Sequence, residues 1–305
     1  MSLPAYAIVS PVRDEAEFLG RTIDSIVAQQ HRPAEWVIVD DGSTDATPQI
    51  AAAAAAANDW IRVVTRPERA SAARGRGKPI VEAFNDGLAT VTAAHEFVVK
   101  MDGDLFVPPH YFEWVARTFE RYPRAGIAGG FGLIPDGNQW IPDQLGRQNV
   151  AGYIKAYRRA CLDEIGGLQA SMGWDGIDEY SARARGWTTH PLTELVVLHY
   201  RRRGTRQSWW RARWDEGAGN AFMGYLPSFV VLRAGYRALV ERPPILSGIV
   251  LFAGWAWARL TRRPQVPDQA AREELRREQR ARLRRRGVSA PPADQGPASF
   301  WHEPS

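Results

Sequence analysis

The fold is decided by residues 36–45, WVIVDDGSTD, in which a short apolar run meets an acidic turn. A run of β-branched and aromatic residues that ends in turn-forming residues is typical of a strand buried in a sheet. An alanine-rich segment over 45–57 follows, and alanine is the strongest helix former. In an open α/β sheet, ligands bind beyond the carboxyl ends of the strands. The stretch therefore predicts a strand–helix unit with a ligand-binding edge.

The same alternation recurs through the first two hundred residues. Strands are expected at 6–10, 36–40, 61–65 and 97–101, and helices at 16–29, 45–57, 78–92 and 108–121. Further along, we expect a loop at 135–152, helices at 158–165 and 177–185, and a closing strand at 195–200. This order predicts an α/β domain over 1–205, with a mostly parallel central sheet flanked by helices.

Composition is that of a soluble globular protein. The chain has 305 residues, of which 45% are hydrophobic and 24% charged, enough for one large domain and an appendage. Cys161 is the single cysteine, which excludes an intrachain disulfide and a cysteine metal cluster and fits a reducing compartment. Residues 1–10 lack the basic and apolar pattern of a secretory signal, so we expect a cytoplasmic location.

The composition changes after residue 200. Arginines and tryptophans mix over 201–214, and a hydrophobic segment follows at 245–257, flanked by Arg242 and Arg259. This segment is shorter than the roughly 20 residues that a membrane-spanning helix needs. It suits a helix lying among anionic headgroups, which predicts a peripheral protein at the inner face of the plasma membrane. A buried helix or a homodimer contact stays equally open.

We therefore expect a helical extension over 206–263 that lies near the membrane or forms an oligomer contact. A charged helix and a disordered tail are expected over 264–305, because the end of the chain is rich in proline and poor in apolar residues.

A second acidic turn follows the predicted strand at 97–101, in VVKMDGD over 98–104. Asp102 and Asp104, separated by one glycine, can place carboxylate oxygens on one divalent cation. Such a cation neutralises the charge that builds on a departing diphosphate. Tight turns also use these residues. Two acidic turns after two predicted strands together favour a nucleotide and metal site.

On these motifs the sequence resembles the family 2 glycosyltransferases of the GT-A fold, over about 6–200. The family's opening turn, its double aspartate and its Asp-X-Asp motif match residues 10–15, 40–43 and 102–104, although Asp14 stands where the family usually has asparagine. The resemblance implies donor-binding roles for Ser10, Pro11, Glu15, Asp40, Asp41 and Asp102. It also implies Mn²⁺ or Mg²⁺ held by Asp104 and Asp102.

The resemblance also implies a catalytic base. The family places a Glu-Asp pair about eleven residues before a Gly-Trp, and counting back from Gly186 reaches Asp175, with Trp174 in place of the glutamate. Asp178 is the second choice. A carboxylate in hydrogen-bond reach of an acceptor hydroxyl removes its proton as the new bond forms. Asp178 and Glu179 can alternatively stabilise the start of a helix.

Other residues have two interpretations each. His199 is either a structural histidine or, by resemblance, a third metal ligand. Arg74 and Lys78 can donate to the diphosphate or belong to a solvated basic loop. Gly167 and Trp174 can shape the acceptor site, where an aromatic face stacks on sugar, or fill a loop.

The function implied is inverting transfer of a sugar from a nucleotide diphosphate, UDP by default, to a hydroxyl of a glycan or lipid-linked acceptor in cell-surface polysaccharide biosynthesis. Processive members carry Gln-X-X-Arg-Trp, but Trp210 occupies the glutamine position here, which favours non-processive transfer. Nucleic-acid binding through 201–214 is an alternative, although the acidic turns would repel phosphates. An inactive scaffold is another, against which the intact Asp102, Asp104 and Asp175 count.

Overall fold

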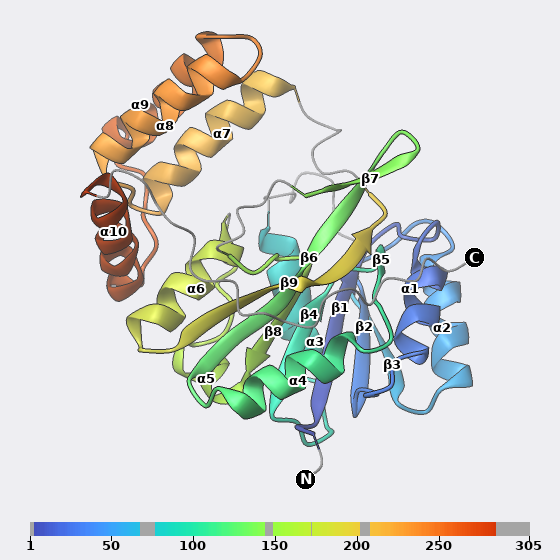
Figure 1. Ribbon diagram of the computed structural model, residues 1–305. Coiled ribbons are helices and arrows are strands. Elements are labelled where there is room, and N and C mark those ends of the chain that lie inside the picture. The colour runs from blue at the N-terminus through green and yellow to red at the C-terminus, as the bar shows by residue number, and fades with distance from the viewer. Residues whose placement is uncertain (1–2, 68–76, 144–148, 172, 202–207, 285–305) are drawn as a thin grey trace. The chain divides into compact units, whose positions relative to one another are not determined.

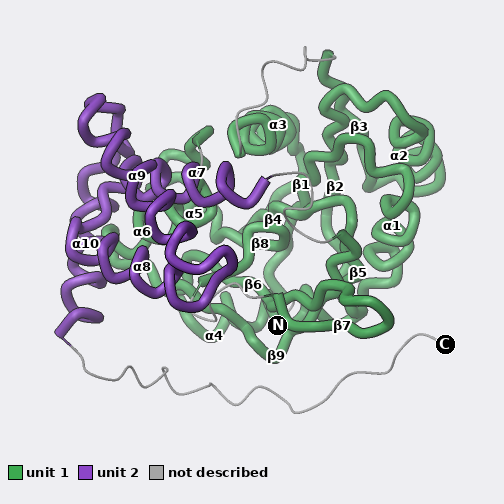
Figure 2. Tube along the Cα trace, turned by 90° about the horizontal axis from the view of Figure 1, so that it is seen from above, with its two compact units in different colours: residues 1–202, 293–305 green, residues 203–292 purple. Residues whose placement is uncertain are grey.

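The computed structural model describes residues 3–67, 77–143, 149–171, 173–201 and 208–284. It divides into two compact units, Met1–Arg202, grouped with the undescribed Ala293–Ser305, and Arg203–Pro292 (Figure 2). The predicted domain boundary at 205 lies outside the described residues. Each unit has a hydrophobic cluster of its own, so each is described by itself.

In the described part of the first unit, nine strands form one sheet (Figure 1). They are β1 (Tyr6–Val12), β2 (Glu35–Asp40), β3 (Ile61–Thr65), β4 (Phe97–Met101), β5 (Leu105–Phe106), β6 (Ala125–Asp136), β7 (Gln139–Pro142), β8 (Ile154–Arg158) and β9 (Thr188–His199). The order is β3-β2-β1-β4-β8-β6-β9-β5, with β7 paired to β6. Strands β1 to β4 are parallel, whereas β8 runs antiparallel to both β4 and β6.

Six helices of the first unit flank the sheet (Figure 1). They are α1 (Leu19–Val27), α2 (Thr47–Ala57), α3 (Lys78–Leu88), α4 (Tyr111–Arg121), α5 (Arg159–Glu164) and α6 (Trp174–Ala184). Side chains alternate between the two faces of a strand. Tyr6 and Ile8 accordingly pack with α1, α2 and α4 on one face, and Ala7 and Val9 pack with α3, α5 and α6 on the other.

The predicted α/β fold, with a mostly parallel sheet between helices, is confirmed. Four of the nine described strands, β5, β6, β7 and β8, were not predicted. Strand β7 lies within the predicted loop at 135–152, where it forms a hairpin with β6. Strand β8 was missed because Lys155 and Arg158 interrupt its apolar pattern, although Lys155 is completely buried.

The second unit contains four helices in its described part: α7 (Trp209–Phe222), α8 (Pro227–Val240), α9 (Leu246–Leu260) and α10 (Gln269–Arg284). Glycines allow the close packing of α9 on its neighbours. A Cβ atom on Gly217 would lie 1.9 Å from the carbonyl oxygen of Leu251, and one on Gly248 would lie 2.3 Å from that of Ala234. Among the described helices, none has the length and apolar character that crossing a membrane requires.

Candidate functional site

The loop after β1 and the turn after β2 are joined by hydrogen bonds. Asp14 adopts a positive φ of 53°, its backbone N–H donates to Ser43 Oγ (3.0 Å), and its carboxylate accepts from the N–H of Thr44 (2.8 Å). The N–H of Glu15 donates to Thr47 Oγ1 (2.7 Å). Because β1 and β2 are parallel neighbours, their carboxyl ends meet at one edge. These bonds fix Glu15 there.

Glu15 lies in a strongly acidic environment. Burial, followed by the negative charge of Asp104, raises its pKa to about 8, although Arg201 opposes this shift. Arg201 donates from both terminal nitrogens to the two Glu15 oxygens, at 3.0 and 2.7 Å. Such bidentate pairs fix geometry as well as charge. Sequence reasoning treated Arg201 only as part of the basic segment, and its position directly after β9 was the signal for this role.

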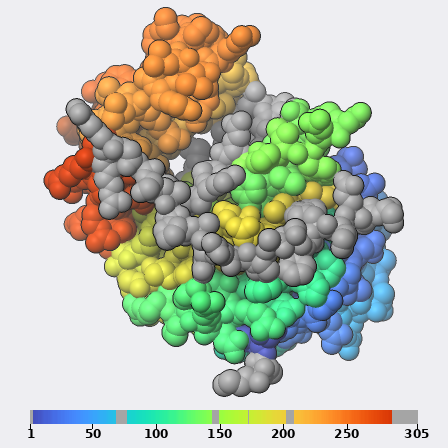
Figure 3. Space-filling model, in the orientation of Figure 1, coloured from blue at the N-terminus to red at the C-terminus, as the bar shows by residue number. Residues whose placement is uncertain are grey.

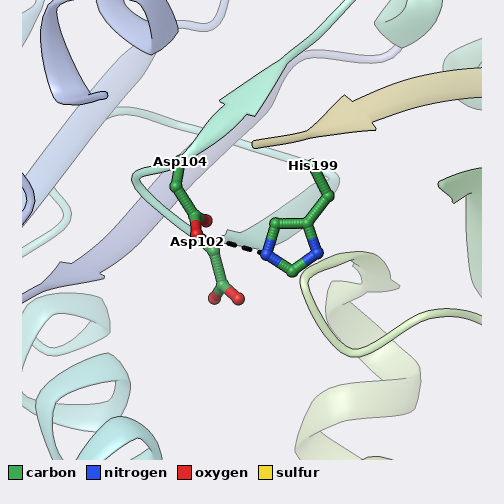
Figure 4. Close-up of side chains that lie close together, drawn as sticks. All are labelled: Asp102, Asp104 and His199. Carbon is green, nitrogen blue, oxygen red and sulfur yellow. Dashed lines mark ion pairs between the residues drawn. The ribbon is translucent and has the colours of Figure 1, made fainter. Parts of the chain in front are cut away.

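Asp102, Asp104 and His199 come together at one place (Figure 4). One ligand atom from each lies within 4.8 Å of the others, and Asp104 Oδ2 is 3.2 Å from His199 Nε2. Strand pairing causes this meeting, since Leu105 in β5 lies opposite His199 in β9. Asp104 and His199 are buried, whereas Asp102 is partly exposed.

The surroundings of His199 suit a ligand. Its ring packs on Tyr153, with 4.9 Å between ring centroids, and its Nδ1 atom is buried with no hydrogen-bond partner among the described residues. The ring nitrogen that faces Asp104 is Nε2, which would be the ligand atom. Two carboxylates and an imidazole form a donor set that divalent metal ions accept. The three residues could therefore hold a divalent cation.

Asp102 is held by a lysine that sequence reasoning missed. Lys100, in β4, is buried, forms an ion pair with Asp102, and donates to the carbonyl oxygen of Gly152 at 3.0 Å. Its Nζ atom also lies 5.2 Å from the ring centroid of Trp174. A buried lysine is tolerated only with such partners. Its position two residues before Asp102 was the available signal.

Asp175 lies in the first turn of α6, next to Gly152. A Cβ atom on Gly152 would lie 2.9 Å from Asp175 Cβ and 3.1 Å from its Oδ2 atom. The same Gly152 accepts the hydrogen bond of Lys100, so one backbone segment contacts both Asp175 and the partner of Asp102. Asp175 is only partly buried. Its carboxylate can therefore meet a substrate.

Asp178, the second candidate base, has a different environment. Lys155 Nζ lies 3.0 and 3.2 Å from its two oxygens, and the hydroxyl of Tyr157 donates to it at 2.5 Å. Glu179 accepts from Lys155 (3.1 Å) and from the backbone N–H of Val150 (2.9 Å). Burial raises the pKa of both carboxyl groups, which share one ammonium. Asp178 thus joins α6 to β8, and Asp175 is the more accessible carboxylate.

The predicted donor residues at β1 and β2 differ in what they contact. Ser10 is completely buried, and its hydroxyl accepts a hydrogen bond from Trp36 Nε1 (3.0 Å). A turn was expected here, but β1 continues to Val12. Pro11 likewise lies within β1. Asp40 caps the turn by accepting from the N–H of Ser43 (3.0 Å). Asp41 pairs with Arg66, which also pairs with Asp86 at 2.7 Å.

The remaining candidates surround α3 and α6. Lys78 begins α3 with an exposed side chain 3.7 Å from Glu82. Trp174 is buried, and a Cβ atom on Gly77 would lie 2.9 Å from its Cδ1 atom, so the start of α3 contacts Trp174. Gly167 adopts a positive φ of 78° in the turn that ends α5. Arg74 lies outside the described residues.

Comparison with known protein sequences supports the family resemblance that the motifs indicated. Residues 7–173 match the sequences grouped as Glycosyl transferase family 2. The O-antigen biosynthesis protein RfbC of Myxococcus xanthus is 28% identical over 211 residues, which cover 62% of this chain and 16% of that protein. The uncharacterized glycosyltransferase alr2836 of Nostoc is 34% identical over 134 residues, which cover 44% and 38%. The chain therefore spans less than half the length of either relative.

The fold also has solved counterparts. The mannosyltransferase PcManGT from Pyrobaculum calidifontis, solved in complex with GDP-Man and Mn²⁺, has a TM-score of 0.55 and 19% identity, with 93% of this chain and 81% of that chain covered. The chain thus has the GT-A fold, as expected from the sequence. Because the matched residues 7–173 make up more than half of its length, the chain belongs to glycosyl transferase family 2.

Proposed function

We propose that this chain transfers a sugar from a nucleotide diphosphate to a hydroxyl of a glycan or lipid-linked acceptor, one sugar at a time and with inversion. Family membership supports the reaction class. The observation that carries the proposal is the grouping of Asp102, Asp104 and His199, together with Gly152, which lies next to Asp175 and accepts a hydrogen bond from the Lys100 partner of Asp102. A charge-neutralising site and a separate carboxylate are the two groups that such a transfer needs.

The donor half of the site lies along the carboxyl ends of β1, β2 and β4. Asp102, Asp104 and His199 would hold Mn²⁺ or Mg²⁺, which supplies positive charge to the diphosphate. Glu15 and Asp41 would accept hydrogen bonds from the nucleoside, each oriented by an arginine partner. Lys78, exposed at the start of α3, would donate to the phosphates. Ser10 supports this edge from within the sheet.

The acceptor half centres on Asp175. Its carboxylate would take the proton of the acceptor hydroxyl while that oxygen attacks the anomeric carbon. The proton moves to Asp175, the bond to the diphosphate breaks, and attack from the opposite side inverts the centre. Lys155 Nζ donates to the Asp175 backbone carbonyl oxygen at 2.6 Å, which fixes the start of α6. Trp174 and Gly167 would contact the acceptor from the same side.

Cell-surface polysaccharide biosynthesis is the proposed pathway class, supported by the similarity to the O-antigen biosynthesis protein of Myxococcus xanthus. The proposed setting is the cytoplasmic face of the plasma membrane. UDP is the first nucleotide to test, and GDP is the second because the mannosyltransferase neighbour was solved with GDP-Man.

The test is release of nucleotide diphosphate from a panel of UDP-, GDP- and dTDP-sugars with Mn²⁺. We expect release to require the cation, and we expect Asp104→Ala to reduce it at least about a hundredfold, the usual cost of removing a group that stabilises developing charge. Asp163→Ala is the matched control, because Asp163 is exposed on α5, where it pairs with Arg159. Equal release by wild type and Asp104→Ala would refute the metal assignment.

A further inference from the structure

The second unit exposes an apolar surface along two helices. The surface, named here the apolar face, consists of Leu232, Leu239, Val240, Ile245, Ile249 and Leu260. Leu239 and Leu260 are 86% and 83% exposed, and the other four are each more than half exposed. Soluble proteins rarely expose a large contiguous group of aliphatic side chains without a partner for it.

The apolar face is separate from the core of its unit. On α8, Leu232 and Leu239 are seven residues apart and share one side of the helix. Ile245 immediately precedes α9, and Ile249 lies in the first turn of that helix. The opposite sides are buried: Val230 and Ala234 pack with Leu251. The exposed residues therefore lie on the sides of α8 and α9 that take no part in packing the helices together. The orange surface in Figure 3 comes from the region of these two helices.

The link between the two helices brings their apolar ends together. The backbone N–H of Ile245 donates to the carbonyl oxygen of Ala238 at 2.9 Å, which turns the chain tightly after α8. Leu239 and Val240, at the end of α8, therefore lie at the same end of the helix pair as Ile245. This end is the most strongly exposed apolar part of the unit.

The charge around the apolar face has one sign. From 227 to 267 the chain has a single acidic residue, Glu241, which pairs with Arg213 and Arg237. Four exposed arginines of this segment form no ion pair with a described residue: Arg242, Arg259, Arg262 and Arg263. Arg242 follows α8, and the other three are at or just beyond the end of α9.

We propose that the apolar face docks on the headgroup region of an anionic lipid bilayer. Aliphatic side chains would enter the boundary between headgroups and acyl chains, and the four arginines would bind anionic headgroups. A second copy of the chain fits the charge less well, because a symmetric contact would bring like-charged arginines together without an acid in the face to pair with them. The proposal concerns binding only and holds whether or not the chain transfers sugar.

The experiment is cosedimentation of the full chain with two kinds of vesicle, one of phosphatidylcholine alone and one of equal parts phosphatidylcholine and phosphatidylglycerol. We expect binding to the mixed vesicles that weakens as salt is raised, and much weaker binding to phosphatidylcholine. The double change Leu239→Glu with Ile249→Glu should lower the partition coefficient at least about tenfold, because two aliphatic side chains no longer enter the bilayer. Arg242→Gln and Arg262→Gln should each lower it about fivefold.

Matched controls lie on α10 of the same unit. Leu283→Glu and Arg280→Gln change exposed residues outside the apolar face, and they should bind as wild type does. Circular dichroism establishes that each variant is folded. The proposal is overturned if the wild-type chain does not sediment with either kind of vesicle. It is equally overturned if the double variant, Leu239→Glu with Ile249→Glu, binds as tightly as the controls. It is also overturned if wild type is a dimer that the double variant dissociates while neither sediments with vesicles, since the face then belongs to a second copy.

Discussion

Two lysines lie opposite one another beneath the site. Lys100 in β4 and Lys155 in β8 are direct cross-strand partners, and both are buried. Like charges at such positions are unfavourable unless each has its own counter-charge. Lys100 pairs with Asp102 of the candidate metal site, and Lys155 pairs with Asp178 and Glu179 on the α6 side. The division separates carboxylates that can meet substrate from carboxylates that hold the fold.

The first residue prediction concerns the base. Asp175→Asn keeps the shape of the side chain but cannot take a proton, so we expect donor binding to persist while transfer to an acceptor falls at least about a hundredfold. Titration of the donor nucleotide with Mn²⁺ and an acceptor assay measure the two effects. If Asp178→Asn loses transfer with unchanged stability and Asp175→Asn retains it, the base is Asp178.

The second residue prediction compares how much each of the two lysines contributes to the free energy of unfolding. Lys155→Met removes the ammonium that Asp178 and Glu179 share, although Glu179 keeps its ion pair with Arg183 at 3.5 Å, so we expect a loss of about 3–5 kcal/mol in the free energy of unfolding. Although burial opposes the charge of Lys155, the two acids raise its pKa, which keeps it charged across neutral pH. Lys100→Met should cost less, because Asp102 is partly exposed and water can solvate it. Urea unfolding measures both, and equal losses would contradict this division.

Residues that follow predicted strands were the ones that sequence could place. Asp40, Asp41, Asp102 and Asp104 all end or follow parallel strands, whose carboxyl ends meet at one edge by geometry alone. Lys155 could not be placed in the same way, because its partners come from α6 and depend on the antiparallel strand β8. The family resemblance placed Ser10 and Pro11 in the opening turn, yet β1 continues through both residues.

At the scale of the element, apolar runs predicted β2, β3 and β4 with their observed ends or within one residue of them. Strand β8 was not predicted, because it contains a lysine that is polar in the sequence. Its charge is neutralised only in the folded protein, where it is buried beside acidic side chains. Helix α6 begins at Trp174, earlier than the predicted 177, because Gly173 adopts a positive φ of 77° and turns the chain into the helix. Local pattern therefore predicted the parallel strands β2, β3 and β4 and missed β8, whose lysine is neutralised by distant acidic residues.

Helix packing in the second unit gives an element prediction. Gly217→Ala would place a methyl group 1.9 Å from the Leu251 carbonyl oxygen, so α7 and α9 must separate, and we expect a loss of about 1–3 kcal/mol. Gly219→Ala, on the same helix, meets nothing within 4 Å and should gain up to about 1 kcal/mol from helix propensity. Thermal unfolding followed by circular dichroism compares the pair. Equal effects of the two changes would contradict the close approach of α7 and α9.

At the scale of the whole molecule, the candidate site and the apolar face belong to different units. All the described residues of the metal group and its acidic neighbours lie within Met1–Arg202, whereas α7 to α10 lie within Arg203–Pro292. The sequence predicted a change near this boundary from composition alone, since arginine and tryptophan become frequent after residue 200. Sequence could not show which helical residues stay exposed, because that depends on how α8 and α9 pack.

The separation of site and apolar face predicts two unfolding transitions with different sensitivities. Mn²⁺ with UDP should raise the unfolding temperature of the first unit, since a ligand bound only to the native state at about 100 times its dissociation constant adds about 2.7 kcal/mol. Gly217→Ala should lower only the transition of the second unit. Differential scanning calorimetry of wild type, Asp104→Ala and Gly217→Ala assigns each transition. Asp104→Ala should lose the ligand-induced shift and keep the second transition, because Asp104 pairs with His199, which belongs to the same first unit. A single transition that both changes move together would contradict independent cores.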